Sequence, residues 1–179
     1  MGERRGREAL DGEASSQHPR VGDGSGHDVA PARDNGGMER STSVDIEAAP
    51  DRVWDVMSDV ERWPEWTETV TAVTRLDAEP LGLGSRVRVE QPKLPPTEYV
   101  VTEFDPGRGF TWVATGLGVR TTARHTIAAR PEGGSRVVLA VEQAGPVGKV
   151  MGRLFFTGLT DRYLATEAAG LKARSESGS

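Results

Sequence analysis

Six consecutive segments of this chain alternate apolar and polar residues, and glycine and proline separate them. They cover residues 69–77, 84–91, 97–105, 109–115, 119–129 and 135–143. An alternation with a period of two gives a strand one buried and one exposed face, which is typical of antiparallel sheets. The joints at residues 105–107 and 131–134 are rich in proline and glycine, as tight turns are. The pattern therefore predicts an antiparallel sheet made of consecutive hairpins.

The region before these segments predicts one more strand and two short helices. Residues 41–47 alternate and stop before Pro50, a residue that suits the first turn of a helix. The apolar residues that follow recur at helical spacing and are Val53, Trp54, Met57 and Val60. Pro64 then interrupts the helix, because proline lacks the N–H and clashes with the preceding turn.

After Gly145 the period changes from 2 to 3.6, which predicts one long helix over about residues 147–173. Such a helix is roughly 40 Å long. Its apolar stripe consists of Val147, Met151, Leu154, Phe155, Leu159, Tyr163 and Leu171. Glycines at 148, 152 and 158 weaken this helix by about 1 kcal/mol each relative to alanine. They indicate either a frayed first turn with close helix–sheet contact, which we favour, or a void between helix and sheet.

Composition divides the chain into a tail and a domain. Residues 1–37 contain no aromatic residue and eight of the 22 glycines, so they cannot bury enough apolar surface to offset the entropy of ordering. We therefore expect a disordered tail over residues 1–39, a domain over residues 40–175 and a disordered end over residues 176–179. A further hypothesis is that Met38 is the true start, which N-terminal sequencing of the natively made protein tests.

Several function classes are disfavoured by composition. The net charge of −5 gives no general attraction to nucleic acid, and no apolar run approaches the roughly 20 residues that span a bilayer. The absence of cysteine removes thiolate sites, and three histidines make a histidine-rich metal site unfavourable. Residues 143–152 fail the phosphate-loop pattern, since Gln143 and Val150 occupy required positions. We expect a cytoplasmic protein with no cofactor, no metal, no nucleic-acid partner and no stable membrane insertion.

Three stretches resemble the helix-grip fold of the START-related superfamily known as SRPBCC, and most of all its bacterial members of the polyketide cyclase/dehydrase type. They read VDIEAAPDRVWDVMSDVERWPEW, GGSRVVLAVE and GPVGKVMGRLFFTGL…LATEAAGLKA, and the likeness covers about residues 41–175. It implies an α+β fold in which a seven-stranded curved antiparallel sheet wraps around the long C-terminal helix. Two short helices follow the first strand, and an apolar cavity lies between the sheet and the long helix.

The resemblance and the strand faces together give a set of candidate cavity-lining residues. They are Trp63, Val87, Val89, Tyr99, Val101, Phe110, Trp112, Ala114, His125, Ile127, Leu139, Met151, Phe155 and Leu159. The alternative is that the same residues simply form a packed core. Trp66 is expected to plug the core, and Trp63 to be either core or cavity wall. Phe104 has the opposite alternation phase, which indicates a bulge or a turn cap.

His125 and Tyr99 are the candidates for proton transfer, because imidazole and phenol can both exchange protons with a ligand. A histidine on an apolar strand face is more often packed and hydrogen-bonded in the core, and we favour that interpretation for His125. No neighbour in sequence supplies an acidic partner for it. The resemblance assigns no catalytic residue, since no family motif matches residue by residue.

The outward phase of the strands carries arginines, at positions 86, 88, 120, 124, 130 and 136. They indicate either a basic surface for RNA or an acidic partner, or a solvated face with cross-strand ion pairs. Glu90, Glu98 and Glu142 are interleaved on the same phase, which favours ion pairs.

The function that these patterns favour is binding of a small hydrophobic or aromatic molecule in the cavity. The first alternative is an enzyme of the cyclase/dehydrase type, in which a folded poly-β-ketone closes by intramolecular aldol addition and loses water. The second is a protein-interaction module, which requires an exposed apolar patch.

Overall fold

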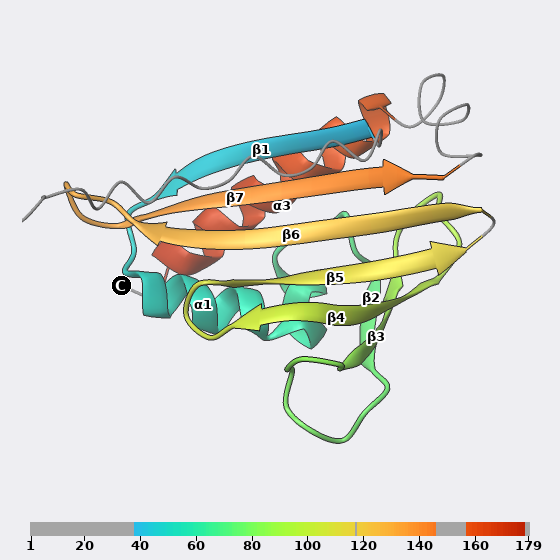
Figure 1. Ribbon diagram of the computed structural model, residues 1–179. Helices are drawn as coiled ribbons and strands as arrows, with labels where there is room; N and C mark the ends of the chain where they lie inside the picture. Colours follow the sequence, from blue (N-terminus) through green and yellow to red (C-terminus); the bar gives the residue numbers. More distant parts are fainter. Residues whose placement is uncertain (1–37, 117, 146–156, 178–179) are drawn as a thin grey trace, which may run out of the picture. The chain divides into compact units, whose positions relative to one another are not determined.

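The computed structural model describes residues 38–116, 118–145 and 157–177, and its centre is one antiparallel sheet (Figure 1). The strands are β1 Met38–Ile46, β2 Ala72–Arg75, β3 Arg86–Glu90, β4 Thr97–Asp105, β5 Gly109–Gly116, β6 Val119–Ala129 and β7 Ser135–Ala144. Their order across the sheet is β1-β7-β6-β5-β4-β3-β2, so consecutive strands from β2 to β7 are hairpin neighbours. The alternating segments thus form the predicted sheet, and the first strand completes it by pairing with the last.

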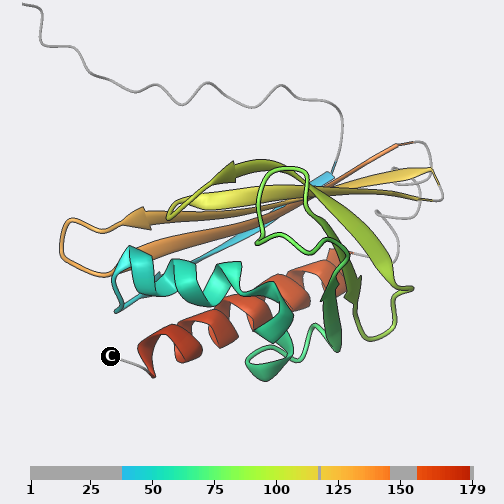
Figure 2. The same ribbon diagram turned by 90° about the horizontal axis from the view of Figure 1, so that it is seen from below.

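Two short helices connect β1 to β2, as predicted. Helix α1 spans Pro50–Ser58 with proline in its first turn, and the 3₁₀ helix η1 spans Val60–Glu65. Asp59 separates the two helices, because its φ of −81° and ψ of 66° lie outside the helical region. Pro64 lies inside η1, where the short helix tolerates its missing N–H. Both helices lie on the same face of the sheet as the C-terminal helix (Figure 2).

The C-terminal helix α3 is described over Thr157–Glu176 and packs against β1, β7 and α1. The predicted start at residue 147 lies outside the described residues, as do Gly148 and Gly152. A Cβ added at Gly158 would meet nothing within 4 Å. Gly170 differs, because an added Cβ would collide with the carbonyl oxygen of Trp66. Close contact between this helix and its neighbours therefore occurs at a glycine that the apolar pattern did not single out. The α+β helix-grip fold is confirmed.

The ends of the domain differ slightly from the prediction. β1 begins at Met38, inside the tail expected to be disordered up to residue 39, because its residues pair with β7 from Met38 opposite Gln143 onward. Helix α3 reaches Glu176, one residue beyond the predicted domain end. Ser177 is also described, and its backbone N–H donates to the carbonyl of Ala173 at 3.1 Å. Residues 1–37 and 178–179 lie outside the described part of the chain.

The face of the sheet turned away from the helices carries the predicted ion pairs. Arg86 lies 3.5 Å from Glu98 and Arg88 lies 3.5 Å from Glu90. The guanidinium of Arg124 lies 2.8 Å from the carboxylate of Glu142. A bulge between Val101 and Glu103 explains the phase of Phe104, which turns to the helix side and meets Trp54 edge-on at 5.4 Å.

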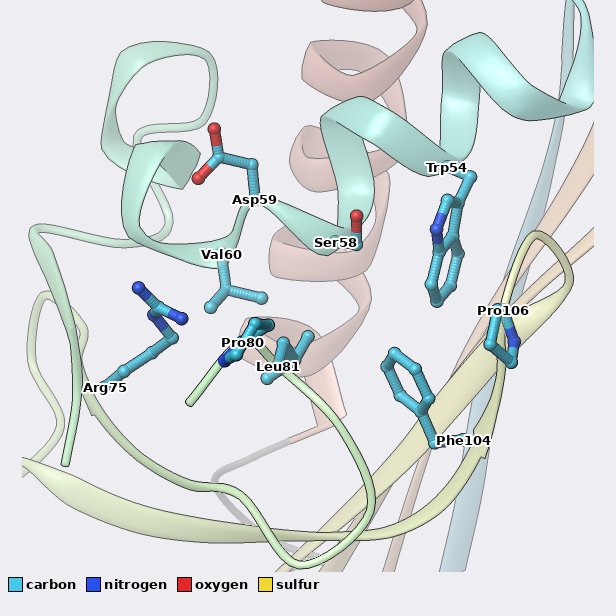
Figure 3. Close-up of a pocket in the computed structure, with 9 residues that line it drawn as sticks. All are labelled: Trp54, Ser58, Asp59, Val60, Arg75, Pro80, Leu81, Phe104 and Pro106. Carbon is cyan, nitrogen blue, oxygen red and sulfur yellow. The ribbon is translucent and has the colours of Figure 1, made fainter. Parts of the chain in front are cut away.

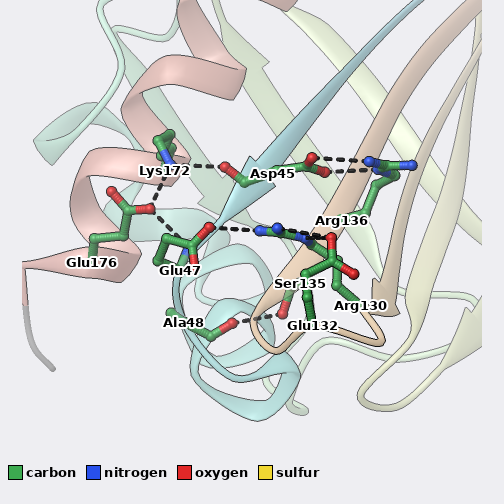
Figure 4. A network of polar contacts seen from close by, with 9 residues as sticks. All are labelled: Asp45, Glu47, Ala48, Arg130, Glu132, Ser135, Arg136, Lys172 and Glu176. Atoms are coloured by element: carbon green, nitrogen blue, oxygen red, sulfur yellow. Dashed lines mark hydrogen bonds and ion pairs between the residues drawn. The ribbon is translucent and has the colours of Figure 1, made fainter.

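A polar cluster joins the end of β1, the β6–β7 turn and the end of α3 (Figure 4). Ser135 is fully buried and donates a hydrogen bond to the carbonyl of Ala48 at 2.7 Å. Lys172 donates to the carbonyl of Asp45 at 2.8 Å, and the carboxylate of Glu176 accepts the N–H of Glu47 at 2.8 Å. The cluster therefore fixes the helix to the sheet at the end opposite the cavity described next.

Candidate functional site

A cavity of about 280 Å³ lies between the sheet and α3. It is bounded by the concave face of the sheet, η1, the β3–β4 connection and the first half of the described helix. The lining residues are Trp63, Val70, Val89, Gln91, Leu94, Pro95, Thr97, Tyr99, Trp112, Gly116, Val119, Thr121, Ala123, Arg124, His125, Leu139, Ala140, Val141, Gln143, Thr160, Tyr163, Leu164 and Glu167. Most of this surface is apolar, and a small set of polar groups enters it, as is usual in small-molecule sites.

The structure separates the candidate lining residues into two groups. Those that line the cavity are Trp63, Val89, Tyr99, Trp112, His125 and Leu139. Those that do not are Val87, Val101, Phe110 and Ile127, which belong to the packed core, Ala114, which is buried in β5, and Leu159, which is half-buried on α3. Met151 and Phe155 lie outside the described residues.

The separation has a physical cause. Alternation identifies which side chains of a strand face the helices. It does not show which of these side chains a helix covers and which are left facing the cavity. Helix α1 packs beside β6, and its Trp54 contacts Phe110 edge-on at 6.5 Å. Helix α1 therefore covers that half of the concave face, and the cavity lies over the other half.

Aromatic rings form one wall of the cavity. Trp112 lies at the centre, with Tyr99 at 5.1 Å and Trp63 at 5.4 Å between ring centroids. The indole N–H of Trp63 donates to the buried carbonyl of Met57 at 3.0 Å, so this ring is both core and wall. Trp66, expected to be the core plug, is half-buried and packs against the edge of the core.

His125 is the polar residue at the base of this wall. It is 5% exposed, stacks on Phe110 at 4.4 Å and meets the edge of Trp112 at 5.4 Å. Its Nδ1 is buried without a hydrogen-bond partner among the described residues. Its Nε2 faces the Oε1 atom of Glu167 at 3.6 Å, a separation longer than a direct hydrogen bond. The sequence favoured a His125 that is both packed and hydrogen-bonded. The structure shows the packing, but neither ring nitrogen has a hydrogen-bond partner among the described residues.

Glu167 is the acidic partner that the sequence analysis did not find. It lies on α3 and its side chain is 13% exposed. A sequence signal existed, because Tyr163, Glu167 and Leu171 follow one another at intervals of four on the apolar stripe. A carboxylate inside such a stripe faces the buried side of its helix.

Two tyrosines add further polar groups to the cavity. Burial, together with the negative charge of Glu167, raises the pKa of Tyr99 to about 12, so its phenol is a neutral hydrogen-bond donor at pH 7. The hydroxyl of Tyr163 donates to the carbonyl of Pro92 and so ties α3 to the β3–β4 connection. The cavity thus combines an apolar body with a carboxylate, an imidazole and a phenol.

A second pocket, of about 360 Å³, lies between the end of α1 and the β4–β5 turn (Figure 3). Trp54, Leu81 and Phe104 give it an apolar side, and Asp59 and Arg75 flank it. The guanidinium of Arg75 is already bound to the carboxylate of Glu61 at 2.9 Å and to the carbonyl of Glu79 at 3.0 Å. With its cation committed in this way, the pocket is a weaker candidate than the cavity beneath α3.

Two further searches of the described residues bear on function. They contain no group of three or more His, Asp or Glu side chains placed to hold a metal ion. In the same ranges, no helix is both long enough and apolar enough to cross a bilayer.

Solved structures with the same fold include an enzyme and proteins of other descriptions. The Zhui aromatase/cyclase from Streptomyces sp. R1128 superposes with a TM-score of 0.65 at 17% identity, over 78% of this chain and 94% of that chain. A START superfamily protein from Mycobacterium smegmatis gives a TM-score of 0.60 at 16% identity, over 79% and 99%. A protein from Thermus thermophilus gives 0.64 at 20% identity, over 79% and 99%. At these identities the likeness shows the fold.

Sequence comparison gives a local match and a family match. Uncharacterized proteins of Mycobacterium tuberculosis and Mycobacterium bovis are 35% identical over 48 residues, which are 27% of this chain and 29% of theirs. Residues 39–176 match the model of a family described as polyketide cyclase/dehydrase and lipid transport. The chain therefore belongs to the polyketide cyclase/dehydrase and lipid transport family, within the helix-grip superfamily that its motifs resemble.

Proposed function

We propose that this protein binds a small hydrophobic or aromatic molecule in the cavity between the sheet and α3. The observation that carries the proposal is the cavity itself, which joins the apolar wall of Trp63, Tyr99 and Trp112 to the polar groups of His125 and Glu167. Its volume of about 280 Å³ lies just below the usual range for small-molecule sites, which begins at about 300 Å³. The family description names polyketide cyclases, dehydrases and lipid transport, and a cavity for a small apolar molecule is compatible with each of them.

The proposal is tested by filling the cavity from the sheet side. Ala123 lines the cavity, whereas Ala128 lies on the same strand and is exposed, so Ala123→Phe and Ala128→Phe form a matched pair. We expect an apolar species in the organic extract of wild type and Ala128→Phe, detected by mass spectrometry, and its loss from Ala123→Phe. Added N-phenyl-1-naphthylamine, a neutral fluorescent probe, should show the same ranking. Equal probe binding by both folded variants contradicts the proposal.

A cyclase or dehydrase activity is the second candidate, and the approach of Glu167 to His125 favours it. A base at this pair can take a proton from the carbon between two carbonyl groups, and the enolate then attacks a second carbonyl to form the new C–C bond. The neutral phenol of Tyr99 can give its proton to the resulting alkoxide and regain one from the protonated base. Water is then lost when the base removes the second proton from the same carbon and returns it to the departing hydroxide. Holding the chain of the poly-β-ketone in a folded form supplies most of the rate enhancement in such a reaction.

This second candidate is tested with shape-conserving variants. In an enzyme, Glu167→Gln and Tyr99→Phe keep substrate binding but lower kcat by about 10²-fold or more, as is typical for loss of an acid or base. Asp161→Asn, an exposed acid on the same helix, serves as control. Unchanged kcat in both cavity variants contradicts the enzymatic role.

An interaction module finds no support in the exposed apolar residues of the described part of the chain. The large ones are Leu76, Leu83, Val100 and Val138. Val100 lies on β4 and Val138 on β7, and two strands separate them in the sheet.

A further inference from the structure

Glu167 is the carboxylate that lines the cavity beside His125. Among the described lining residues, Arg124 and Glu167 are the groups that are ionised in water at neutral pH. The guanidinium of Arg124 binds two carboxylates, those of Glu142 at 2.8 Å and Glu39 at 3.1 Å, so one positive charge faces two negative ones. This ion-paired guanidinium belongs to the face of the sheet turned away from the helices, so it supplies no counterion inside the cavity.

Glu167 has no comparable counterion among the described residues. Its one neighbour within ion-pair distance there is His125. The separation of 3.6 Å between His125 Nε2 and Glu167 Oε1 is longer than a direct hydrogen bond, so His125 is not a direct hydrogen-bond partner of this carboxylate. The side chain of Glu167 is 13% exposed, and no lysine or arginine among the described residues lies within ion-pair distance of it, so this carboxylate favours a cationic partner.

The aromatic wall beside Glu167 favours the same kind of partner. The face of an aromatic ring carries partial negative charge, and tryptophan and tyrosine attract organic cations most strongly. Trp112 has Tyr99 on one side and Trp63 on another, with centroid separations of 5.1 Å and 5.4 Å. The negative charge of Glu167 also contributes to the raised pKa of the Tyr99 phenol, so the carboxylate acts on the interior of the cavity.

From this arrangement we propose that the cavity selects ligands in which a protonated amine is attached to an apolar or aromatic body. The ammonium group binds the carboxylate of Glu167, and the body packs against Tyr99 and Trp112. A ligand with a carboxylate is rejected, because it would place a second negative charge beside the mostly buried carboxylate of Glu167. This inference rests on the proposed ligand-binding function and specifies its ligand class.

Three probes of matched size and different charge test the selection. They are 3-phenylpropylamine, 3-phenyl-1-propanol and 3-phenylpropionate, titrated calorimetrically into the full chain at pH 7.5. We expect the amine to bind about tenfold tighter than the alcohol, which is 1.4 kcal/mol, and the carboxylate to bind more weakly than either. Glu167→Gln should remove the preference for the amine over the alcohol. The control Asp161→Asn should keep the wild-type ranking, since Asp161 is exposed and does not line the cavity.

The outcomes separate this inference from the function on which it rests. Binding of the alcohol without any gain for the amine overturns the cation preference and leaves the ligand-binding site intact. A preference for the amine that survives in Glu167→Gln also overturns it. Failure of all three probes to bind wild type counts against both proposals. If Glu167→Gln does not fold, the ranking of the three probes on wild type still decides, because tighter binding of the carboxylate than of the amine contradicts the inference.

Discussion

Single residues in this protein take part in both the core and the cavity, and Trp63 is the clearest case. Its ring is 2% exposed and lines the cavity, and its indole N–H holds the carbonyl of Met57 where α1 ends. A ligand that contacts this ring therefore contacts the structural core directly. Such a residue ties the shape of the binding site to the stability of the fold.

Replacing Trp63 with phenylalanine tests this double role. The change removes ring atoms from a buried position and leaves the carbonyl of Met57 without its donor, so we expect a loss of about 2–4 kcal/mol in the free energy of unfolding. Trp66→Phe is the matched control and should cost less, because Trp66 is half-buried at the edge of the core. Urea unfolding measures both variants, and a larger loss for Trp66→Phe contradicts the assignment.

Tyr99 gives a prediction for alkaline pH. Its pKa is raised to about 12 by burial and by the charge of Glu167, whereas an unfolded tyrosine titrates near pH 10. The folded state therefore holds this proton between pH 10 and 12 while the unfolded state releases it. The stabilisation from Tyr99 is complete below pH 10 and is lost as pH rises toward 12.

Ultraviolet titration of the phenolate absorbance measures this pKa directly. The chain has two tyrosines, so the difference between wild type and Tyr99→Phe isolates the step that belongs to Tyr99. Glu167→Gln should lower the pKa of Tyr99, because it removes the negative charge but keeps the burial. A Tyr99 step near pH 10 in wild type would show that the phenol is not held in the apolar wall.

At the level of elements, the sequence predicted the strands and helices well because their periods are local properties. The alternation over residues 119–129 matches β6 from end to end. The segment over 69–77 yields only β2, Ala72–Arg75, because its one neighbour β3 has just five residues to pair with it. The site was less predictable, since Glu167 and His125 are 42 positions apart and only the packing of α3 on the sheet brings them together.

We expect substitution by alanine to have opposite effects on stability at the two glycines described within α3. Gly158→Ala should stabilise the protein by about 0.5–1 kcal/mol, because alanine favours helix and an added Cβ meets nothing within 4 Å. Gly170→Ala should destabilise it in spite of the same helix preference, because the added Cβ collides with the backbone of Trp66. Thermal unfolding measures both variants, and stabilisation by Gly170→Ala would show that α3 packs less closely on η1 than described.

At the level of the whole molecule, the start of β7 is held to the end of β1 and the residues after it by two kinds of polar contact. The hydrogen bond from buried Ser135 to Ala48 is neutral, whereas the bidentate pair of Arg136 with Asp45 is exposed. We expect Ser135→Ala to cost about 1–3 kcal/mol, because it leaves a buried carbonyl without its donor. Arg136→Gln should cost under about 1 kcal/mol, as exposed ion pairs usually do. Urea unfolding of both variants gives the comparison, and a larger cost for Arg136→Gln contradicts it.

Removal of residues 1–37 tests whether the rest of the chain folds by itself. Their composition provides almost no apolar surface for a core, and β1 is already paired with β7 from Met38 onward. The chain over residues 38–179 should therefore melt at the same temperature as the full chain, measured by circular dichroism. A contribution of about 1 kcal/mol from the removed segment would lower the melting temperature by about 4 °C in a domain of this size. A shift of that size would place part of the folded domain before Met38, whereas an unchanged midpoint with an unchanged urea m-value assigns the whole cooperative unit to residues 38–179.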